Sequence, residues 1–274
     1  MLVRRVTSVA TLLLCAGVAS ASSCPVSLGE VVQFTTVEEA YAKLPDVPLK
    51  DEFETTVEYE SRIATIAPPS GYIAIEKAGE FKTFYNADEN RFEFRDSELF
   101  GSGFYYREPY DYLGNGVTLT DTDRSYFLEI DKQVTGTQIG SNIFGVEAEI
   151  IKESWTRFYV YEGQRSGLAF RNMETDFNRQ EQVKNNPYIS EINAQYFVVP
   201  VEREKAKALK DTMRRALVVN PKRPFQFEGQ DTSSPTIDDP RDIKISDRFL
   251  VADVHCAIVT DGSGKVLKVV QTND

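Results

Sequence analysis

The chain has 274 residues, of which 42 are acidic and 31 are basic, so its formal net charge at pH 7 is −11. Such a chain is repelled by nucleic acid and by anionic lipid headgroups, which excludes both as expected partners. The composition, 41% hydrophobic and 11% aromatic, is typical of a globular chain with a sizeable core and excludes an intrinsically disordered one.

The N-terminal stretch has the pattern of a secretory signal peptide. Arg4 and Arg5 precede an almost wholly apolar run from Val6 to Val18, and small residues up to Ala21 suit a signal peptidase. The apolar run is shorter than the ~20 residues that span a bilayer. We therefore expect residues 1–21 to be removed, leaving a periplasmic or secreted bacterial protein with no transmembrane segment.

Cleavage would leave two cysteines, Cys24 and Cys256. An even pair in an oxidising compartment predicts a disulfide bond that joins the new N-terminus to the last hairpin, with two free thiols as the alternative. A lipid anchor on Cys24 is not expected, because Ala21 stands where a lipoprotein signal has a leucine.

Two capped helices are expected in the first part of the chain. Thr36 can cap the first, which ends before Pro45. Thr55, with Glu58 three residues later, can cap the second, which closes at Pro68.

From Tyr72 the hydrophobic period changes to two, which is typical of β-strands. The expected strands are 72–75, 81–85, 91–94, 117–120, 125–130, 146–150, 156–161 and 189–199. The segment from Gly136 to Gly145 is predicted to be a turn rich in glycine and asparagine.

A third helix is predicted from Glu202 to Val219, and Asn220-Pro221 would end it. Its apolar stripe consists of Ala206, Leu209, Met213 and Leu217. A connector is expected from Phe225 to Arg241, followed by a hairpin around Asp261 to Gly264.

These elements predict an α+β fold, mainly antiparallel β-sheet flanked by about three helices. The expected organisation is one α+β domain over 22–224. Residues 225–274 would form the connector and a C-terminal β-hairpin packed on the same domain.

The segment around the second helix carries the pattern Phe-Glu-Thr-x-x-x-Tyr-x-x-Arg, formed by Phe53, Glu54, Thr55, Tyr59 and Arg62. Ahead of a Tyr/Phe-rich β region with an Asn-x-Phe-Gly step, it resembles segments of uncharacterised exported bacterial proteins. The resemblance covers about residues 45–220 and implies a shared fold but no activity. In physical terms the pattern describes a capped helix that lays Phe53, Tyr59 and Ile63 on the sheet and pairs Arg62 with Glu58.

An aromatic loop is the strongest candidate for a binding site. Aromatic faces beside polar and charged groups suit glycan, peptide or protein surfaces, although the same rings would also serve as core. The candidate residues are Phe104, Tyr105, Tyr106, Tyr110 and Tyr112. An exposed sheet edge that accepts a partner strand is a further alternative.

Metal and cysteine–histidine chemistry have little support. His255, the only histidine, is next to Cys256, but neighbouring side chains on a strand point to opposite faces. One histidine and two distant cysteines exclude ordinary zinc and copper sites. The stretches 86–90 and 121–125 are interpreted as turns because they do not fit a calcium loop, and no cofactor is expected.

Glu147 and Glu149 would lie on the same face of a strand and could act as paired carboxylates. The sequence contains no nucleophile elbow and no P-loop. It therefore favours a non-enzymatic binding or envelope-associated protein whose partner is a protein, peptide or glycan. A hydrolase acting on envelope polysaccharide or peptide and a lipid-anchored assembly component are the alternatives.

Overall fold

The computed structural model describes residues 24–45, 47–48, 50–95, 99–100, 123–141, 144–164 and 195–272, together with three short strands at 110–112, 117–119 and 174–175. The expected signal peptide, residues 1–21, lies outside the described residues.

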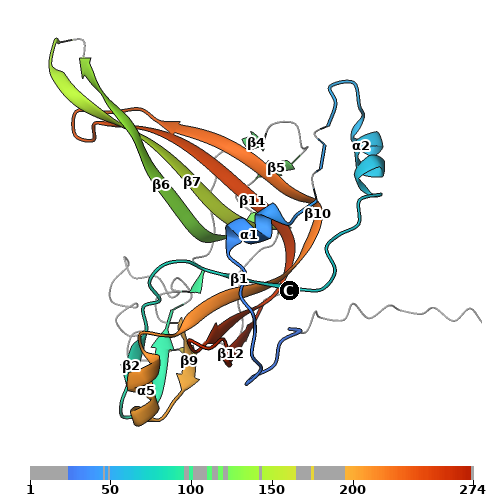
Figure 1. Ribbon diagram of the computed structural model, residues 1–274, viewed down its shortest axis with the longest axis vertical. Helices are drawn as coiled ribbons and strands as arrows, with labels where there is room; N and C mark the ends of the chain where they lie inside the picture. The colour runs from blue at the N-terminus through green and yellow to red at the C-terminus, as the bar shows by residue number, and fades with distance from the viewer. Residues whose placement is uncertain are drawn as a thin grey trace, which may run out of the picture.

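Within the described residues the fold is mostly β-sheet with three helices (Figure 1). The large sheet has the strand order β1-β10-β11-β7-β6, and β12 also pairs with β11. Its strands are β1 (Ile73–Glu76), β6 (Asp123–Ser141), β7 (Glu147–Gln164), β10 (Arg214–Ser233), β11 (Arg241–Thr260) and β12 (Val266–Gln271).

The other elements are short. A second sheet, ordered β2-β3-β9-β8, contains β2 (Phe84–Asn86), β3 (Arg91–Phe94), β8 (Glu174–Thr175) and β9 (Gln195–Pro200), and β4 (Tyr110–Tyr112) pairs with β5 (Val117–Leu119). The helices are α1 (Val37–Ala42), α2 (Thr56–Ile63) and α5 (Arg203–Leu209).

The large sheet is mixed rather than purely antiparallel. β7 and β11 run parallel from Ile151 beside Arg241 to Tyr161 beside Val251, while every other pair of described strands is antiparallel. The reason is that two long antiparallel hairpins, β6–β7 and β10–β11, lie side by side with their turns at the same end. Their second strands therefore run in the same direction.

The predicted long helix from Glu202 to Val219 is wrong in its second half. α5 ends at Leu209, and β10 begins at Arg214. Leu217 faces the main core while Val218 faces a second, smaller core, so this stretch is buried on both faces between β1 and β11. Burial on two faces suits a central strand, and it overrides the helical spacing of the apolar residues.

Two segments predicted as irregular are also strands. Most of the expected connector is the distal part of β10, which continues to Ser233 after a register shift between Pro221 and Gln226. The expected turn from Gly136 is the end of β6, which continues to Ser141. Both segments contain residues that are rare in strands, prolines at a bulge in one and glycines inside the strand in the other. The sequence pattern therefore did not indicate a strand in either segment.

We call the end of the large sheet that contains β1 and β12 the base, and this end is covered on both faces. One face joins β2–β3, β9 and α1 in the main core, which includes Phe92 and Phe158. The N-terminal segment covers the other face, where Val32 packs with Val218 and Ile258. A disulfide between Cys24 and Cys256, with 5.4 Å between their Cα atoms, ties this segment to β11.

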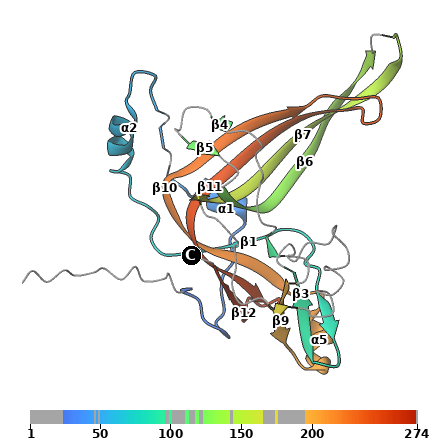
Figure 2. The ribbon, with the colours of Figure 1, turned by 180° about the vertical axis from the view of Figure 1, so that it is seen from behind.

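The two long hairpins continue beyond the base as a four-stranded extension, seen from opposite sides in Figures 1 and 2. We call this extension the arm. It comprises residues 131–141 of β6, 147–158 of β7, 226–233 of β10 and 241–249 of β11, together with the turns that join them.

Candidate functional site

A row of four aromatic rings, one from each strand, marks the root of the arm. Phe127 and Tyr159 have ring centroids 5.6 Å apart, Tyr159 stacks on Phe249 at 5.0 Å, and Phe249 stacks on Phe227 at 4.5 Å. The last three rings are fully buried. Contacts of this kind between neighbouring strands fix their register, so the four strands leave the base as one unit.

A buried ion pair lies one step further along the same face. The Arg157 guanidinium donates two hydrogen bonds, of 2.5 and 2.6 Å, to the Asp247 carboxylate, which is only 1% exposed. Burial raises the pKa of Asp247, and the hydrogen bonds and charge of Arg157 oppose that rise. The pair joins β7 to β11 next to the root of the arm.

The single tryptophan extends these cross-strand contacts. The Lys132 ammonium lies 3.9 Å from the centroid of the Trp155 ring, and the Trp155 indole nitrogen donates to Glu153 at 2.7 Å. Arg241 of β11 approaches the same ring at 5.8 Å. Side chains from three strands therefore stiffen the arm between its root and its end.

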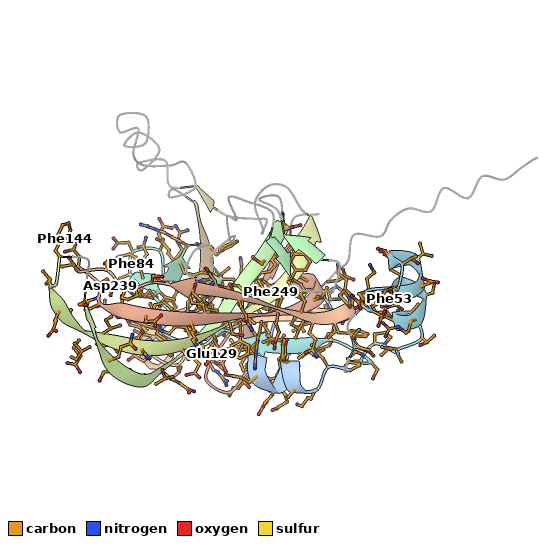
Figure 3. All side chains as sticks on the ribbon, turned by 90° about the horizontal axis from the view of Figure 1, so that it is seen from above. Phe53, Phe84, Glu129, Phe144, Asp239 and Phe249 are labelled. Atoms are coloured by element: carbon orange, nitrogen blue, oxygen red, sulfur yellow. A yellow bond between two sulfur atoms is a disulfide. The ribbon has the colours of Figure 1, made fainter. Side chains whose placement is uncertain are left out.

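Large apolar side chains are exposed together at the end of the arm. Ile139 is 70% exposed, Phe144 84%, Val146 55% and Ile237 71%, and we call these four residues the tip patch. Figure 3 places Phe144 at the far end of the arm, well away from Phe249 at its root. Scattered apolar residues are normal on a surface, but a group of them on a projecting end indicates a contact surface.

A pocket lies between the two hairpin turns, and two residues of the tip patch, Val146 and Ile237, line it. The pocket has a volume of about 370 Å³ and is lined by Gly140, Ser141, Val146, Ala148, Ile150, Pro235, Thr236, Ile237 and Pro240. Its lining is mainly apolar and comes from both hairpins. A partner side chain that enters it would therefore contact both hairpins at once.

Acidic residues form a rim around the tip patch. Glu147, Glu149 and Asp238 are exposed, and none of them is in an ion pair recorded among the described residues. Asp239 is paired with Arg241 through bonds of 2.6 and 2.8 Å, and these hydrogen bonds lower the pKa of Asp239. The rim is net negative, so it complements a basic rim on a partner.

The aromatic loop predicted as a binding site lies largely outside the described residues. This holds for Phe104, Tyr105 and Tyr106 entirely. Tyr110 and Tyr112 belong to β4, which contacts β10, but their side chains lie outside the description. The prediction for this loop therefore stays a prediction.

Glu147 and Glu149 do lie two positions apart on β7, as expected. Both are exposed in the acidic rim. A glycosidase usually keeps its acid in a desolvated pocket that raises the carboxyl pKa. The position of these two residues at an open arm end suits charge complementarity better than proton transfer.

His255 and Cys256 form no dyad. Cys256 is bonded to Cys24, and β11 has an extra residue at His255, because Val218 pairs with Cys256 while Val219 pairs with Val254. With the Asn220 amide in its preferred orientation, the His255 Nε2 donates to the Asn220 side-chain oxygen at 3.0 Å. His255 thus has a structural role at a bulge.

The pattern around α2 has mainly a structural explanation, with two corrections. The capping box between Thr55 and Glu58 is present, and Tyr59 is buried. Arg62 pairs with Glu54 at 2.7 Å rather than with Glu58, because Glu58 is engaged in the cap. Phe53 is 87% exposed and does not lie on the sheet.

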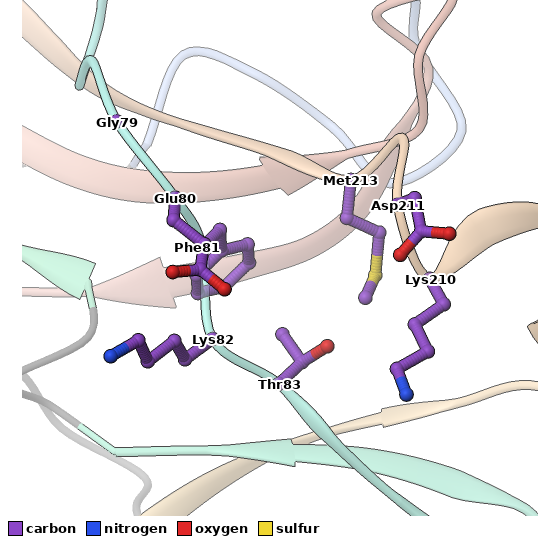
Figure 4. A pocket seen from close by; sticks show the side chains of 8 residues that line it. All are labelled: Gly79, Glu80, Phe81, Lys82, Thr83, Lys210, Asp211 and Met213. Atoms are coloured by element: carbon purple, nitrogen blue, oxygen red, sulfur yellow. The ribbon is translucent and has the colours of Figure 1, made fainter.

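A larger pocket, of about 560 Å³, lies between residues 79–83 and the α5–β10 turn (Figure 4). Its charged lining consists of Lys82, Lys210, Glu80 and Asp211. The two positive and two negative side chains balance, so the pocket favours neither an anion nor a cation.

A buried polar cluster occupies the base of the β6–β7 hairpin. The Tyr126 hydroxyl donates to Glu162 at 3.0 Å, and Arg124 lies 3.5 Å from the same carboxylate. Burial raises the pKa of Tyr126 well above its usual range. All three residues are less than 9% exposed, so the cluster stabilises the hairpin rather than forming an open site.

Sequence reasoning missed the tip patch, although a signal was present. Phe144 lies in a segment predicted as a turn, and Ile237 lies in the predicted connector. Turns are normally polar, so large apolar residues inside two of them indicate a contact surface.

Comparison with protein-family models, curated proteins and solved structures finds no match for this chain. Among the described residues, no helix is long and apolar enough to cross a membrane.

Proposed function

We propose that this chain is an exported, non-enzymatic binding protein that docks a partner protein through the tip of its arm. The observation that carries the proposal is the tip patch, in which four large apolar side chains are more than half exposed on a stiff projection. A preorganised surface binds well because little conformational freedom is lost on association. The aromatic row and the Arg157–Asp247 pair supply that stiffness.

The charge around the patch supports a protein partner with an apolar centre and a basic rim. The exposed acids Glu147, Glu149 and Asp238 would repel an anionic membrane surface. They would also repel a second copy of the same tip. Apolar contact at the centre with opposite charge at the rim is the usual anatomy of a specific protein interface.

The disulfide supports an oxidising compartment, which agrees with the export pattern at the N-terminus. It also engages the Cys24 sulfur that a lipid anchor would need. The hydrolase alternative gains no such support, because Glu147 and Glu149 are exposed at the arm end.

The proposal can be tested by site-specific photo-crosslinking in the native cell. A photoreactive residue at Phe144 is expected to give a discrete covalent adduct with one protein, identified by mass spectrometry. Leu28, which is 71% exposed at the base, provides the matched control position and should not give that adduct. The proposal is wrong if both positions give the same adducts, or if Phe144 gives none.

A further inference from the structure

The strand β6 is an edge of the large sheet, and its distal half is open to solvent. It pairs with β7 on one side, and no other described strand lies on its other side. From Asp131 to Ser141 every residue is exposed except Gly136 and Gly140, which are half-buried. The backbone N–H and C=O groups that point away from β7 are therefore accessible to another strand.

This edge lacks two of the features that usually prevent strand addition, namely proline and repeated charge. The stretch from Lys132 to Ser141 contains no proline and no charge other than Lys132 itself. One bulge interrupts it between Val134 and Gly136, where the Thr135 hydroxyl donates to the Lys152 carbonyl at 3.2 Å. The opposite edge of the arm, on β10, carries the acids Glu228 and Asp231.

Side chains beside this edge favour a partner strand of particular chemistry. Val134, 69% exposed, lies opposite Glu153, and Ile139, 70% exposed, lies opposite Glu149. Because Glu149 and Glu153 are an even number of residues apart on β7, these four side chains share one face. An added strand would meet two apolar side chains there, with two carboxylates one strand further in.

We infer that the partner adds an extended segment to the β6 edge along residues 132–141, with apolar side chains on Val134 and Ile139 and lysine or arginine toward Glu149 and Glu153. This inference rests on the proposed function, because Ile139 is also a member of the tip patch. The added strand would therefore run directly into that patch. Main-chain hydrogen bonds supply affinity in this mode of recognition, and alternate side chains supply specificity.

The test uses a synthetic probe, a fluorescent ten-residue peptide in which threonine occupies every second position and valine and lysine share the positions between, so that valine and lysine lie on one face of the added strand. Saturable binding to the full chain is expected, and a peptide with glutamate in place of lysine should bind at least tenfold more weakly. Amide hydrogen exchange on addition of the lysine peptide should slow at alternate residues between 132 and 141. Absence of saturable binding would overturn the inference, as would protection confined to any other edge.

Proline substitutions provide matched variants. Thr137 and Gln138 point their N–H groups to opposite sides of β6, so proline at one of them blocks the open edge while proline at the other disrupts the pairing with β7. Both Thr137→Pro and Gln138→Pro are made. The one that keeps the wild-type unfolding midpoint is the edge-blocked variant, and its affinity for the peptide should fall at least tenfold. The control pair on the β10 edge is Gln230→Pro and Asp231→Pro. Whichever of these two keeps the wild-type unfolding midpoint should leave peptide affinity unchanged.

The outcomes separate the inference from the proposed function. If the edge-blocked variant binds the peptide as the wild type does, strand addition is wrong, while the crosslink at Phe144 still tests the tip independently. A wild-type dimer in sedimentation that the same proline abolishes would assign the edge to a second copy and would also overturn the inference.

Discussion

The base and the arm are built from the same long strands, but the base buries its apolar residues whereas the tip of the arm exposes them. In β10, the stretch from Arg215 to Val219 is completely buried, whereas the end from Gln230 to Ser233 is exposed. At the base, the main core covers one face of the sheet and the disulfide-tied N-terminal segment covers the other. At the arm tip, large apolar side chains remain open to solvent.

This contrast shows where the sequence supplies stability and where it supplies contact. Apolar residues that hold the fold are concentrated in the base and in the aromatic row at the arm root. Those at the tip contribute little burial, so their presence needs another reason, and partner binding is the one we propose. Substitutions in the two regions should therefore affect different measurements.

The largest expected loss of stability comes from the arm root. Phe249→Ala should lower the free energy of unfolding by about 3–5 kcal/mol, because it removes a fully buried ring stacked between two others. Urea denaturation of the purified chain measures this. The matched change Phe144→Ala at the tip should stay within about 0.5 kcal/mol of wild type. Equal losses for the two variants would contradict the distinction between root and tip.

Arg157→Met should cost about 3–5 kcal/mol at pH 7, because it leaves the Asp247 carboxylate buried without its bidentate partner. Burial raises the pKa of Asp247 above its unfolded value of 3.8, and loss of Arg157 removes the opposing influence. A raised carboxyl pKa favours folding below the unfolded pKa, and that contribution is lost as the pH rises through the folded pKa. The loss caused by the variant should therefore be smaller at pH 3.5 than at pH 7, and a loss independent of pH would contradict this account.

Removing the disulfide should cost about 2–4 kcal/mol, because the bond restricts the unfolded chain across a separation of 232 residues. The double variant Cys24→Ala/Cys256→Ala tests this by denaturation. A reducing agent should destabilise the wild type by a similar amount and leave the double variant unchanged. If the wild type is insensitive to reduction, the N-terminal cover of the base does not depend on the bond.

The smallest effect is expected at α2, which lies away from both the root and the tip. The hydrogen bond from Arg62 lowers the pKa of Glu54, so the pair stabilises the fold above the ordinary glutamate pKa of 4.5, and its contribution is lost as the pH falls through the folded pKa. Glu54→Gln should lower the thermal midpoint slightly at pH 7 and not at pH 3. A larger effect at pH 3 would reverse the sign and contradict the pairing.

Sequence patterns predicted the elements that depend on neighbouring residues. The Thr36 and Thr55 caps, the β2–β3 hairpin and the hairpin around Asp261 to Gly264 all have local signals, and the structure contains each of them. Local signals failed where distant segments decide the conformation. Leu217 and Val218 became a strand because β1 and β11 bury them from both sides.

The parallel pairing of β7 with β11 could not be predicted from the sequence either. It joins Trp155 to Ile245 across about ninety residues and depends on how two hairpins pack. The candidate site could be predicted from the sequence in part. Apolar residues inside predicted turns mark the tip patch, but only the structure brings Phe144 and Ile237 to one end of the arm.

The most direct test of the central claim compares affinities for the partner captured at Phe144, after that partner has been purified. The double variant Phe144→Ser/Ile237→Ser should bind it at least tenfold more weakly than wild type, while Leu28→Ser, at a position of the base as exposed as Ile237, should bind normally. Equal affinity of the tip variant and the wild type would contradict the assignment of the arm tip as the binding surface.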